Sequence, residues 1–173
     1  MGYEGFHIQD FAVFQIPDLD GRMQAIRERI QPKFRLLGQD LTDDLSLQLG
    51  QDMYLHIAKH ARRKVNPPKD TWFAISHNKR GYKQHPHFQL GLFDDHVFLW
   101  LAYISEISNK DQIGEKLIQE IPTIKKSIPD DFVISTNHTE KTACKLEDTD
   151  LENVLHNFKA IKNREFLIGK KLH

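Results

Sequence analysis

The sequence has few of the features that identify a known chemistry. Its single cysteine, Cys144, excludes an intramolecular disulfide and a cysteine-based zinc site. It contains no glycine loop of the Walker or dinucleotide-binding type and no Gly-x-Ser-x-Gly motif, so the usual signatures of nucleotide-binding proteins and serine hydrolases are absent. Its apolar runs are far shorter than the ~20 residues of a membrane-spanning helix. We therefore expect a cytoplasmic protein without a membrane partner or a cofactor.

Metal binding is not expected either, although the chain contains ten histidines. Two pairs have spacings that would bring both rings to one side of an element: His85 with His87 on a strand, and His56 with His60 on a helix. A zinc site needs three or four ligands, and no His-Glu-x-x-His motif occurs. The sequence thus predicts no metal.

A net charge is also lacking, but the charges are unevenly distributed. Lys and Arg number 24, as do Asp and Glu, so the formal net charge is zero at pH 7. Residues 59–83 nevertheless hold eight cations and one carboxylate, Asp70, which gives this segment a net charge of +7. Concentrated positive charge repels itself in a folded protein, and its usual use is to bind an acidic partner or an anionic ligand.

Length and composition are typical of one globular domain. At 173 residues, with 39% hydrophobic and 28% charged side chains, the chain can bury a sizeable core. Eleven phenylalanines and two tryptophans argue against disorder. We expect a single domain over residues 1–173.

The first third of the sequence favours helices. Apolar residues over 19–37 recur every three or four positions, with Pro32 inside the pattern, so we expect a helix with a kink or a break, ending at Gly38. A second helix is predicted over residues 42–64, because the same spacing continues there and a basic last turn precedes Pro67.

The remainder changes to strand patterns. Three strands are expected, over residues 72–76, 87–93 and 96–104. Only Asp94 and Asp95 separate the last two, which should form an antiparallel hairpin, and the third is apolar on both faces and should be central. Further helices are predicted over residues 108–121 and 149–161, and short strands over 132–135, 142–146 and 164–170. The sequence therefore predicts an α+β fold, with a helical N-terminal third followed by a mainly antiparallel sheet covered by helices.

The loop between the first two expected strands is the best candidate for a binding site. It spans residues 77–86, whereas a hairpin needs two to five residues, and overlong loops in compact domains are often functional. Its cations suit phosphate or carboxylate, Gly81 allows close approach of a ligand to the backbone, and Tyr82 offers a ring for stacking. The alternative is a solvated loop, in which Lys and Arg are the residues most easily exposed.

Residues near this loop extend the predicted pocket. His87 and Gln89 alternate with apolar residues on the following strand, so both point to one face, which Gly91 leaves open. The basic end of the predicted second helix favours an anion site, provided that the fold brings the two segments together. The expected ligand-binding residues are Arg62, Arg63, Trp72, Lys79, Arg80, Gly81, Tyr82, Lys83, His87 and Gln89.

Several functions are compatible with these residues. The first hypothesis is a pocket for a small anionic ligand, in particular a phosphorylated one. The second is binding of RNA or single-stranded nucleic acid, since aromatic rings among cations suit stacking, although such proteins are usually basic overall. The third is a hydrolase or transferase acting on a phosphorylated substrate, with His87 as candidate general acid or base. A scaffold protein with a solubilising loop is the remaining alternative; whether a reaction is catalysed and the oligomeric state are left open.

Four stretches of the sequence resemble a known family. The motifs AKHARR (58–63) and NPPKDTW (66–72), and KRGYK (79–83) with PHFQLG (86–91), resemble the YktB family of uncharacterised small proteins of Gram-positive bacteria. Residues near both ends are similar as well, so the resemblance spans nearly the whole chain. It implies an α+β single-domain cytosolic protein of unknown function and supplies no catalytic residues.

Overall fold

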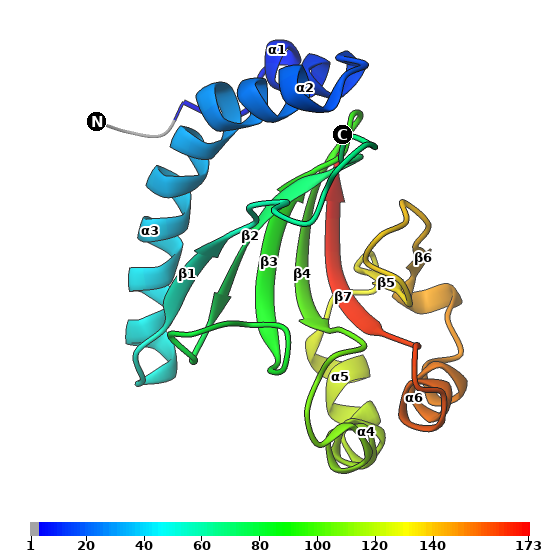
Figure 1. Cartoon of the computed structure of the whole chain (residues 1–173). Helices are drawn as coiled ribbons and strands as arrows, with labels where there is room; N and C mark the ends of the chain where they lie inside the picture. Colours follow the sequence, from blue (N-terminus) through cyan, green and yellow to red (C-terminus); the bar gives the residue numbers. More distant parts are fainter. Residues whose placement is uncertain (1–3) are drawn as a thin grey trace.

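Seven strands form one sheet, in the order β1-β2-β3-β4-β7-β5-β6, in the computed structural model, which describes residues 4–173 (Figure 1). All the strand pairs are antiparallel. The strand with two apolar faces, β4, is central, as predicted. The strands are β1 (Tyr54–Ile57), β2 (Thr71–Ser76), β3 (His87–Leu92), β4 (Val97–Tyr103), β5 (Val133–Ser135), β6 (Cys144–Lys145) and β7 (Phe166–Leu172).

Helices precede the sheet and are inserted between β4 and β7. The predicted α+β fold is confirmed, and the predicted helices and strands after residue 71 are all present, with α5 in addition. The helices are α1 (Ile8–Phe11), a 3-10 turn (Ala12–Gln15), α2 (Leu19–Ala25), a π-helical turn (Ile26–Ile30), α3 (Gln31–Leu49), α4 (Lys110–Gln119), α5 (Ile121–Ser127), a second 3-10 turn (Leu146–Asp148) and α6 (Leu151–Ala160).

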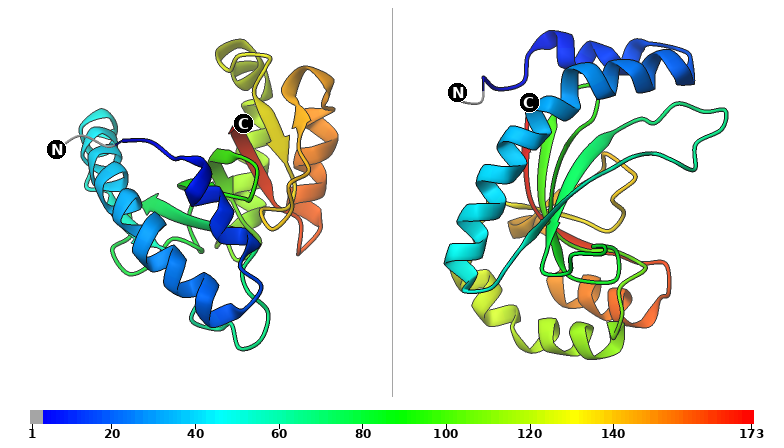
Figure 2. Two further views of the ribbon diagram at one scale, coloured as in Figure 1. Left: turned by 90° about the horizontal axis from the view of Figure 1, so that it is seen from above. Right: turned by 60° about the vertical axis from the view of Figure 1, so that its left-hand side comes forward.

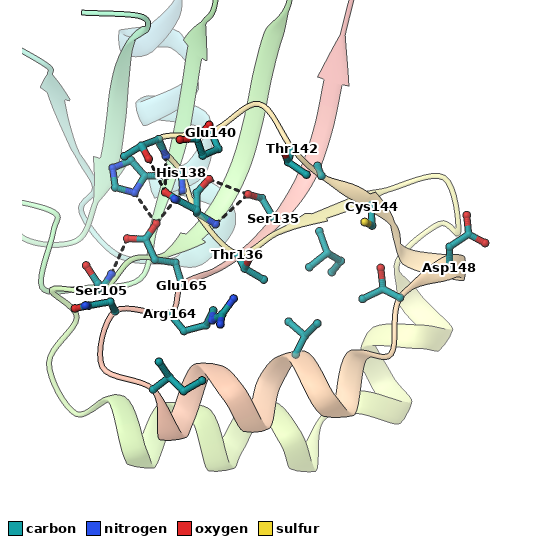
Figure 3. A pocket seen from close by; sticks show the side chains of 18 residues that line it. Ser105, Ser135, Thr136, His138, Glu140, Thr142, Cys144, Asp148, Arg164 and Glu165 are labelled. Atoms are coloured by element: carbon teal, nitrogen blue, oxygen red, sulfur yellow. Dashed lines mark hydrogen bonds and ion pairs between the residues drawn. The ribbon is translucent and has the colours of Figure 1, made fainter. Parts of the chain in front are cut away.

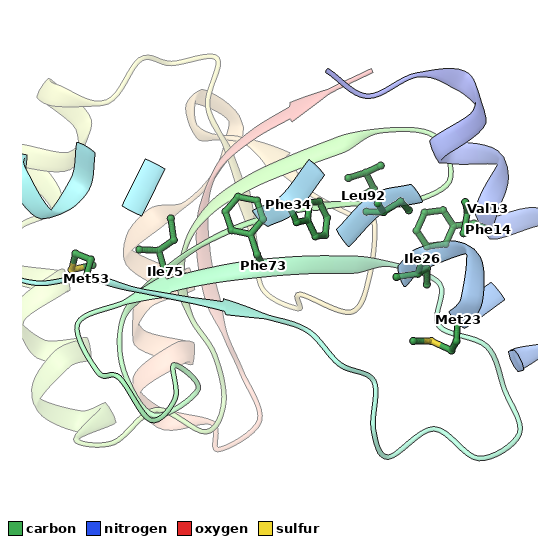
Figure 4. Packing of buried hydrophobic residues seen from close by; sticks show 10 residues of the cluster. Val13, Phe14, Met23, Ile26, Phe34, Met53, Phe73, Ile75 and Leu92 are labelled. Atoms are coloured by element: carbon green, nitrogen blue, oxygen red, sulfur yellow. The ribbon is translucent and has the colours of Figure 1, made fainter. Parts of the chain in front are cut away.

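The expected irregularity near Pro32 is the π-helical turn that joins α2 to α3. Pro32 lies in the first turn of α3, where its missing N–H and its ring do least harm. The turn keeps the apolar stripe on one side, so that Ile26, Ile30 and Phe34 are fully buried. Phe34 meets Phe73 of β2 edge to face at 5.2 Å, in the core shown in Figure 4.

The predicted second helix over residues 42–64 is wrong. Helix α3 runs on to Leu49 and ends at Gly50, whose left-handed conformation (φ 67°) lets its N–H reach the carbonyl oxygen of Ser46. Strand β1 follows, with Leu55 opposite Ile75 in the register of β2. Apolar residues four apart satisfy both the helical repeat and the alternation of a strand, and the pairing with β2 decides for the strand.

Gly38 lies within α3 and does not end it, contrary to the prediction. A side chain at this position would meet Leu55 of β1, with its Cβ only 2.6 Å from the Leu55 Cδ1. A larger residue would force the Leu55 side chain to move, so the glycine suits the close approach of helix and strand.

The two faces of the sheet are covered differently. Helices α2 and α3 pack on one face, through the cluster that contains Phe73 and Ile75. Figure 2 shows loops on the other side of the sheet from α3. That loop-covered face buries the cluster of Trp100, Ala102 and Leu167. The loop after β2 therefore lies on the side that is free of α3, whereas α4, α5 and α6 pack through Leu101, Phe166 and Ile168 on the same face as α3.

Candidate functional site

A band of polar side chains lies on the loop-covered face. Alternation along β2, β3, β5 and β7 directs them to the same side of the sheet as Trp100. Buried polar groups need hydrogen-bond partners, so six of them in one region are more informative than the apolar core on the other face. The band consists of Asp70, Ser76, His87, Gln89, Ser135 and Glu165, each at most 7% exposed.

The loop after β2 is fixed to this face by polar contacts. The Ser76 hydroxyl contacts the carbonyl oxygen of Gly81 at 3.0 Å. The indole N–H of Trp72 donates to the Tyr82 hydroxyl at 3.0 Å. The Tyr82 ring also packs edge to face on His87, with 4.8 Å between centroids. The loop therefore has a defined conformation and places Tyr82 over the polar band.

A cavity of about 760 Å³, which we call the loop pocket, lies between this loop and β1. Three cations line it: Lys59 after β1, and Arg80 and Lys83 in the loop. Glu106 is the one carboxylate in its lining. The other polar and aromatic lining residues are His56, Asn78, Tyr82, Gln84 and His85. The volume is within the usual range for small-molecule sites.

The residues predicted for the ligand site are only partly brought together. Arg80, Gly81, Tyr82 and Lys83 line the loop pocket, Trp72 and His87 contact Tyr82, and Gln89 lies behind His87. Arg63 lines a separate cavity of about 450 Å³ beside α2. The remaining two predicted residues, Arg62 and Lys79, have exposed side chains.

His87 has little freedom to exchange protons with a ligand. Its ring is buried, and Nδ1 lies 2.9 Å from the carbonyl oxygen of His85, which can only accept, so Nδ1 carries a proton. Nε2 lies 3.4 Å from the side-chain oxygen Oε1 of Gln89. Burial also lowers the pKa of His87, although these hydrogen bonds oppose the effect. Burial outweighs these contacts, so the net pKa is lowered, which favours a neutral ring that supports Tyr82.

The sequence analysis did not identify His138 or Glu165, which form a short polar contact on this face. The Glu165 carboxylate accepts from the His138 Nδ1–H at 2.6 Å and from the His138 backbone N–H at 2.9 Å. Its second oxygen accepts from the backbone N–H of Ser105 at 2.8 Å. Both side chains line a cavity of about 670 Å³ between β5, β7 and α6, the His138 pocket of Figure 3.

The contact between His138 and Glu165 favours the charged form of both. Burial raises the pKa of Glu165, but the hydrogen bonds and charge of His138 and the Ser105 N–H outweigh it, so the net pKa is lowered. Burial likewise lowers the pKa of His138, and the bond and charge of Glu165, helped by Asp70, more than compensate, so the net pKa is raised. No hydrogen bond of His138 Nε2 with residues 4–173 is found.

Asp70, at the start of β2, is a buried carboxylate without a close cationic partner. Burial raises its pKa from 3.8 to about 6, against the opposing charges of His138 and Arg63. No ion pair joins it to a cation in the described part of the chain. A carboxyl group with a pKa close to neutrality can accept a proton at physiological pH.

The two pockets adjoin. The consecutive residues Ser105 and Glu106 line the His138 pocket and the loop pocket, respectively. Trp72 donates to Tyr82 of the loop pocket, and its ring centroid is 6.3 Å from that of His138. Lys83 of the loop pocket is close enough for its charge to lower the pKa of His138.

Two properties of the described chain bear on the site. Within residues 4–173, no group of three or more His, Cys, Asp or Glu side chains is placed to hold a metal ion. No helix in the described chain has the length and apolarity to cross a membrane.

The sequence matches the model of a domain of unknown function, DUF1054, over residues 6–173. This chain belongs to that family. It is 54% identical over 165 residues to the UPF0637 protein of Exiguobacterium sibiricum, covering 95% of this chain and 81% of that protein. It is also 52% identical over 168 residues to a UPF0637 protein of Oceanobacillus iheyensis (97% and 81% covered) and 48% identical over 170 residues to one of Listeria monocytogenes (98% and 83% covered). The relatives are uncharacterised proteins of Gram-positive bacteria.

Proposed function

We propose that this DUF1054 protein binds a small phosphorylated anion in the loop pocket. The observation that carries the proposal is that Lys59, Arg80 and Lys83, from two segments of the chain, line one cavity with a single carboxylate, Glu106. Phosphate groups are bound by converging cations and N–H donors, and Tyr82 adds a ring on which an organic part of the ligand can stack.

The neutrality of the whole chain supports a local anion site over a general nucleic-acid surface. The cations of residues 59–83 are balanced by carboxylates elsewhere, so the attraction for an anion is confined to the neighbourhood of the loop. The same loop carries part of the resemblance to the YktB family. We further propose that the YktB family and DUF1054 are one family, and that the protein is cytoplasmic.

Thermal unfolding with and without anions tests the proposal. Inorganic phosphate, sugar phosphates, nucleotides and polyphosphate would each be added in turn. A ligand at 100 times its dissociation constant adds about 2.7 kcal/mol of stability, which for a chain of this length raises the midpoint by roughly 5–11 °C. The Arg80→Ala/Lys83→Ala variant should lose this gain.

The matched control is Lys125→Ala/Lys126→Ala, which removes the same charge from exposed positions at the end of α5. Its midpoint should rise with the anion as that of the unaltered protein does. Absence of a rise with every anion, or an equal loss in both variants, would contradict the loop pocket. Tight binding of single-stranded RNA that weakens steeply with salt would favour the nucleic-acid hypothesis instead.

A further inference from the structure

We propose that the ligand of the loop pocket is a ribonucleoside phosphate, whose base packs on Tyr82 and whose ribose hydroxyls donate to Glu106. This inference rests on the proposed function, because the cations of the same pocket are taken to hold the phosphate. It goes further in naming the class of the ligand from two residues that a bare anion does not need. Both of them line the same cavity as the cations, so one molecule can contact them all.

The Tyr82 ring is fixed by contacts within the protein. Its hydroxyl accepts from the Trp72 indole N–H at 3.0 Å, and its ring packs edge to face on the buried His87 at 4.8 Å. Its carbonyl oxygen accepts from the His85 N–H at 3.0 Å. Packing on a ring that is already fixed costs little conformational entropy. Since every base has a flat face, such a ring binds a nucleotide whichever base it carries.

A second ring, that of His56 in β1, lies beside Tyr82 in the lining of the pocket. His56 pairs with Ala74 and, through the register of the sheet, lies on the same face as Trp100, which is the loop-covered face. Its Nε2 donates to the carbonyl oxygen of Asn78 at 2.9 Å, so this ring is also oriented. The centroids of His56 and Tyr82 are 5.7 Å apart. Because the two rings contact each other, a base would pack on their common surface and not between them.

Glu106 argues against a ligand that consists only of phosphate. Its side chain is exposed in the lining of the cavity that contains the cations. The segment that carries it is tied to the loop, because the backbone N–H of Ser108 donates to the carbonyl oxygen of Gln84 at 3.0 Å. A carboxylate repels every added phosphate group but accepts hydrogen bonds from hydroxyl groups. Carboxylates bind the ribose hydroxyls in this way in known nucleotide sites.

Among the anions considered for this pocket, a ribonucleoside phosphate is the one that uses every kind of lining group. Inorganic phosphate and polyphosphate leave the rings uncovered and meet the charge of Glu106. A sugar phosphate satisfies Glu106 and the cations but leaves the rings uncovered. A ribonucleoside phosphate places its base on the rings, its ribose at Glu106 and its phosphate among Lys59, Arg80 and Lys83. The volume of about 760 Å³ is in the range of cavities that hold ligands of this kind.

Titration calorimetry of the unaltered protein tests the inference with four ligands: pyrophosphate, ribose 5-phosphate, adenosine 5′-monophosphate (AMP) and its 2′-deoxy analogue. AMP should bind roughly 5- to 150-fold more tightly than ribose 5-phosphate, because only AMP has a base to stack. The 2′-deoxy analogue should bind roughly 3- to 10-fold more weakly than AMP, because it lacks one hydroxyl for Glu106.

Variants of the two residues should change these preferences separately. Tyr82→Leu should reduce the preference for AMP over ribose 5-phosphate to less than about twofold, whereas Tyr82→Phe keeps the ring and should keep the preference. Glu106→Gln should abolish the preference for AMP over its 2′-deoxy analogue. The same variant should bind pyrophosphate more tightly, because a repelling charge has been removed. The matched control is Glu152→Gln, which removes a carboxylate that is 73% exposed on α6, outside the lining of the loop pocket.

The outcomes separate the two proposals. Equal affinities for AMP and ribose 5-phosphate, both lost in Arg80→Ala/Lys83→Ala, would overturn the inference and leave the anion pocket standing. If none of the four ligands binds, the proposed function fails and the inference with it. A hexamer of oligoadenylate that binds more than about 100-fold more tightly than AMP, with a steep dependence on salt, would overturn the inference in favour of RNA. Should Tyr82→Leu not fold, the comparison of AMP with ribose 5-phosphate decides, because it uses only the unaltered protein.

Discussion

Replacing Asp70 by asparagine should make the protein more stable at neutral pH. The carboxyl group is 7% exposed, and burial raises its pKa from 3.8 to about 6. The folded protein therefore binds this proton more tightly than the unfolded chain does. As the pH rises from below 4 to above 6, ionising Asp70 removes stability, and the cost is complete above pH 6. An amide of nearly the same shape has no charge to bury.

The magnitude follows from the two pKa values. A tenfold difference in proton affinity corresponds to about 1.4 kcal/mol, so the change from 3.8 to about 6 costs about 3 kcal/mol at pH 7.5. At pH 4 most of the difference is gone, and roughly 0.5 kcal/mol remains. For a chain of this size, Asp70→Asn should raise the unfolding midpoint at pH 7.5 by as much as roughly 6–12 °C.

The assay is thermal or urea unfolding of both proteins at pH 4 and pH 7.5. The control is Asp131→Asn, because Lys170 holds the pKa of that exposed carboxyl below its usual value and its removal should not stabilise. A variant that is less stable than the unaltered protein at pH 7.5, or a difference that is the same at both pH values, would refute the burial of an ionised Asp70.

Three further outcomes are expected from the same structure. Glu165→Gln should destabilise the protein by about 1.5–3 kcal/mol. The loss should be largest between about pH 4.5 and 6.5. The lowered pKa of Glu165 gives stability that is lost on acidification, and the raised pKa of His138 gives stability that is lost as the pH rises through it. Urea unfolding across this pH range measures it. Trp72→Phe should cost about 1 kcal/mol in urea unfolding, because the Tyr82 hydroxyl loses its donor. Phe34→Ala should cost about 3–5 kcal/mol, since its ring is fully buried; calorimetry showing a loss below 1 kcal/mol would contradict the packing of α3.

Local patterns predicted much of the fold. The strands from β2 onward were found because alternation and turn residues are read over a few positions, and the hairpin of β3 and β4 needs only Asp94 and Asp95 between them. The prediction of a helix over residues 42–64 was wrong because apolar residues four apart fit both a helix and a strand. Gly50, whose left-handed conformation ends α3, was the local signal that could have corrected it.

The candidate site was harder to predict because its parts are distant in sequence. The basic loop could be recognised because its charge and its length are properties of one segment of 25 residues. His138 and Glu165 are 27 residues apart and lie in no motif, so their contact depends on β5 pairing with β7 in a long-range register. Glu165 precedes an apolar strand without any local mark of burial.

The loop-covered face contains groups that lower the stability of the fold, and this argues that the face has a function. On the α3 face, buried rings such as Phe34 and Phe73 pack in an apolar core. On the other face the chain buries an ionisable Asp70 at a cost and places Lys83 where it opposes the charge of His138. Groups that work against folding persist where activity needs them. Two such groups on one face make that face, rather than the helical one, the place to look for chemistry.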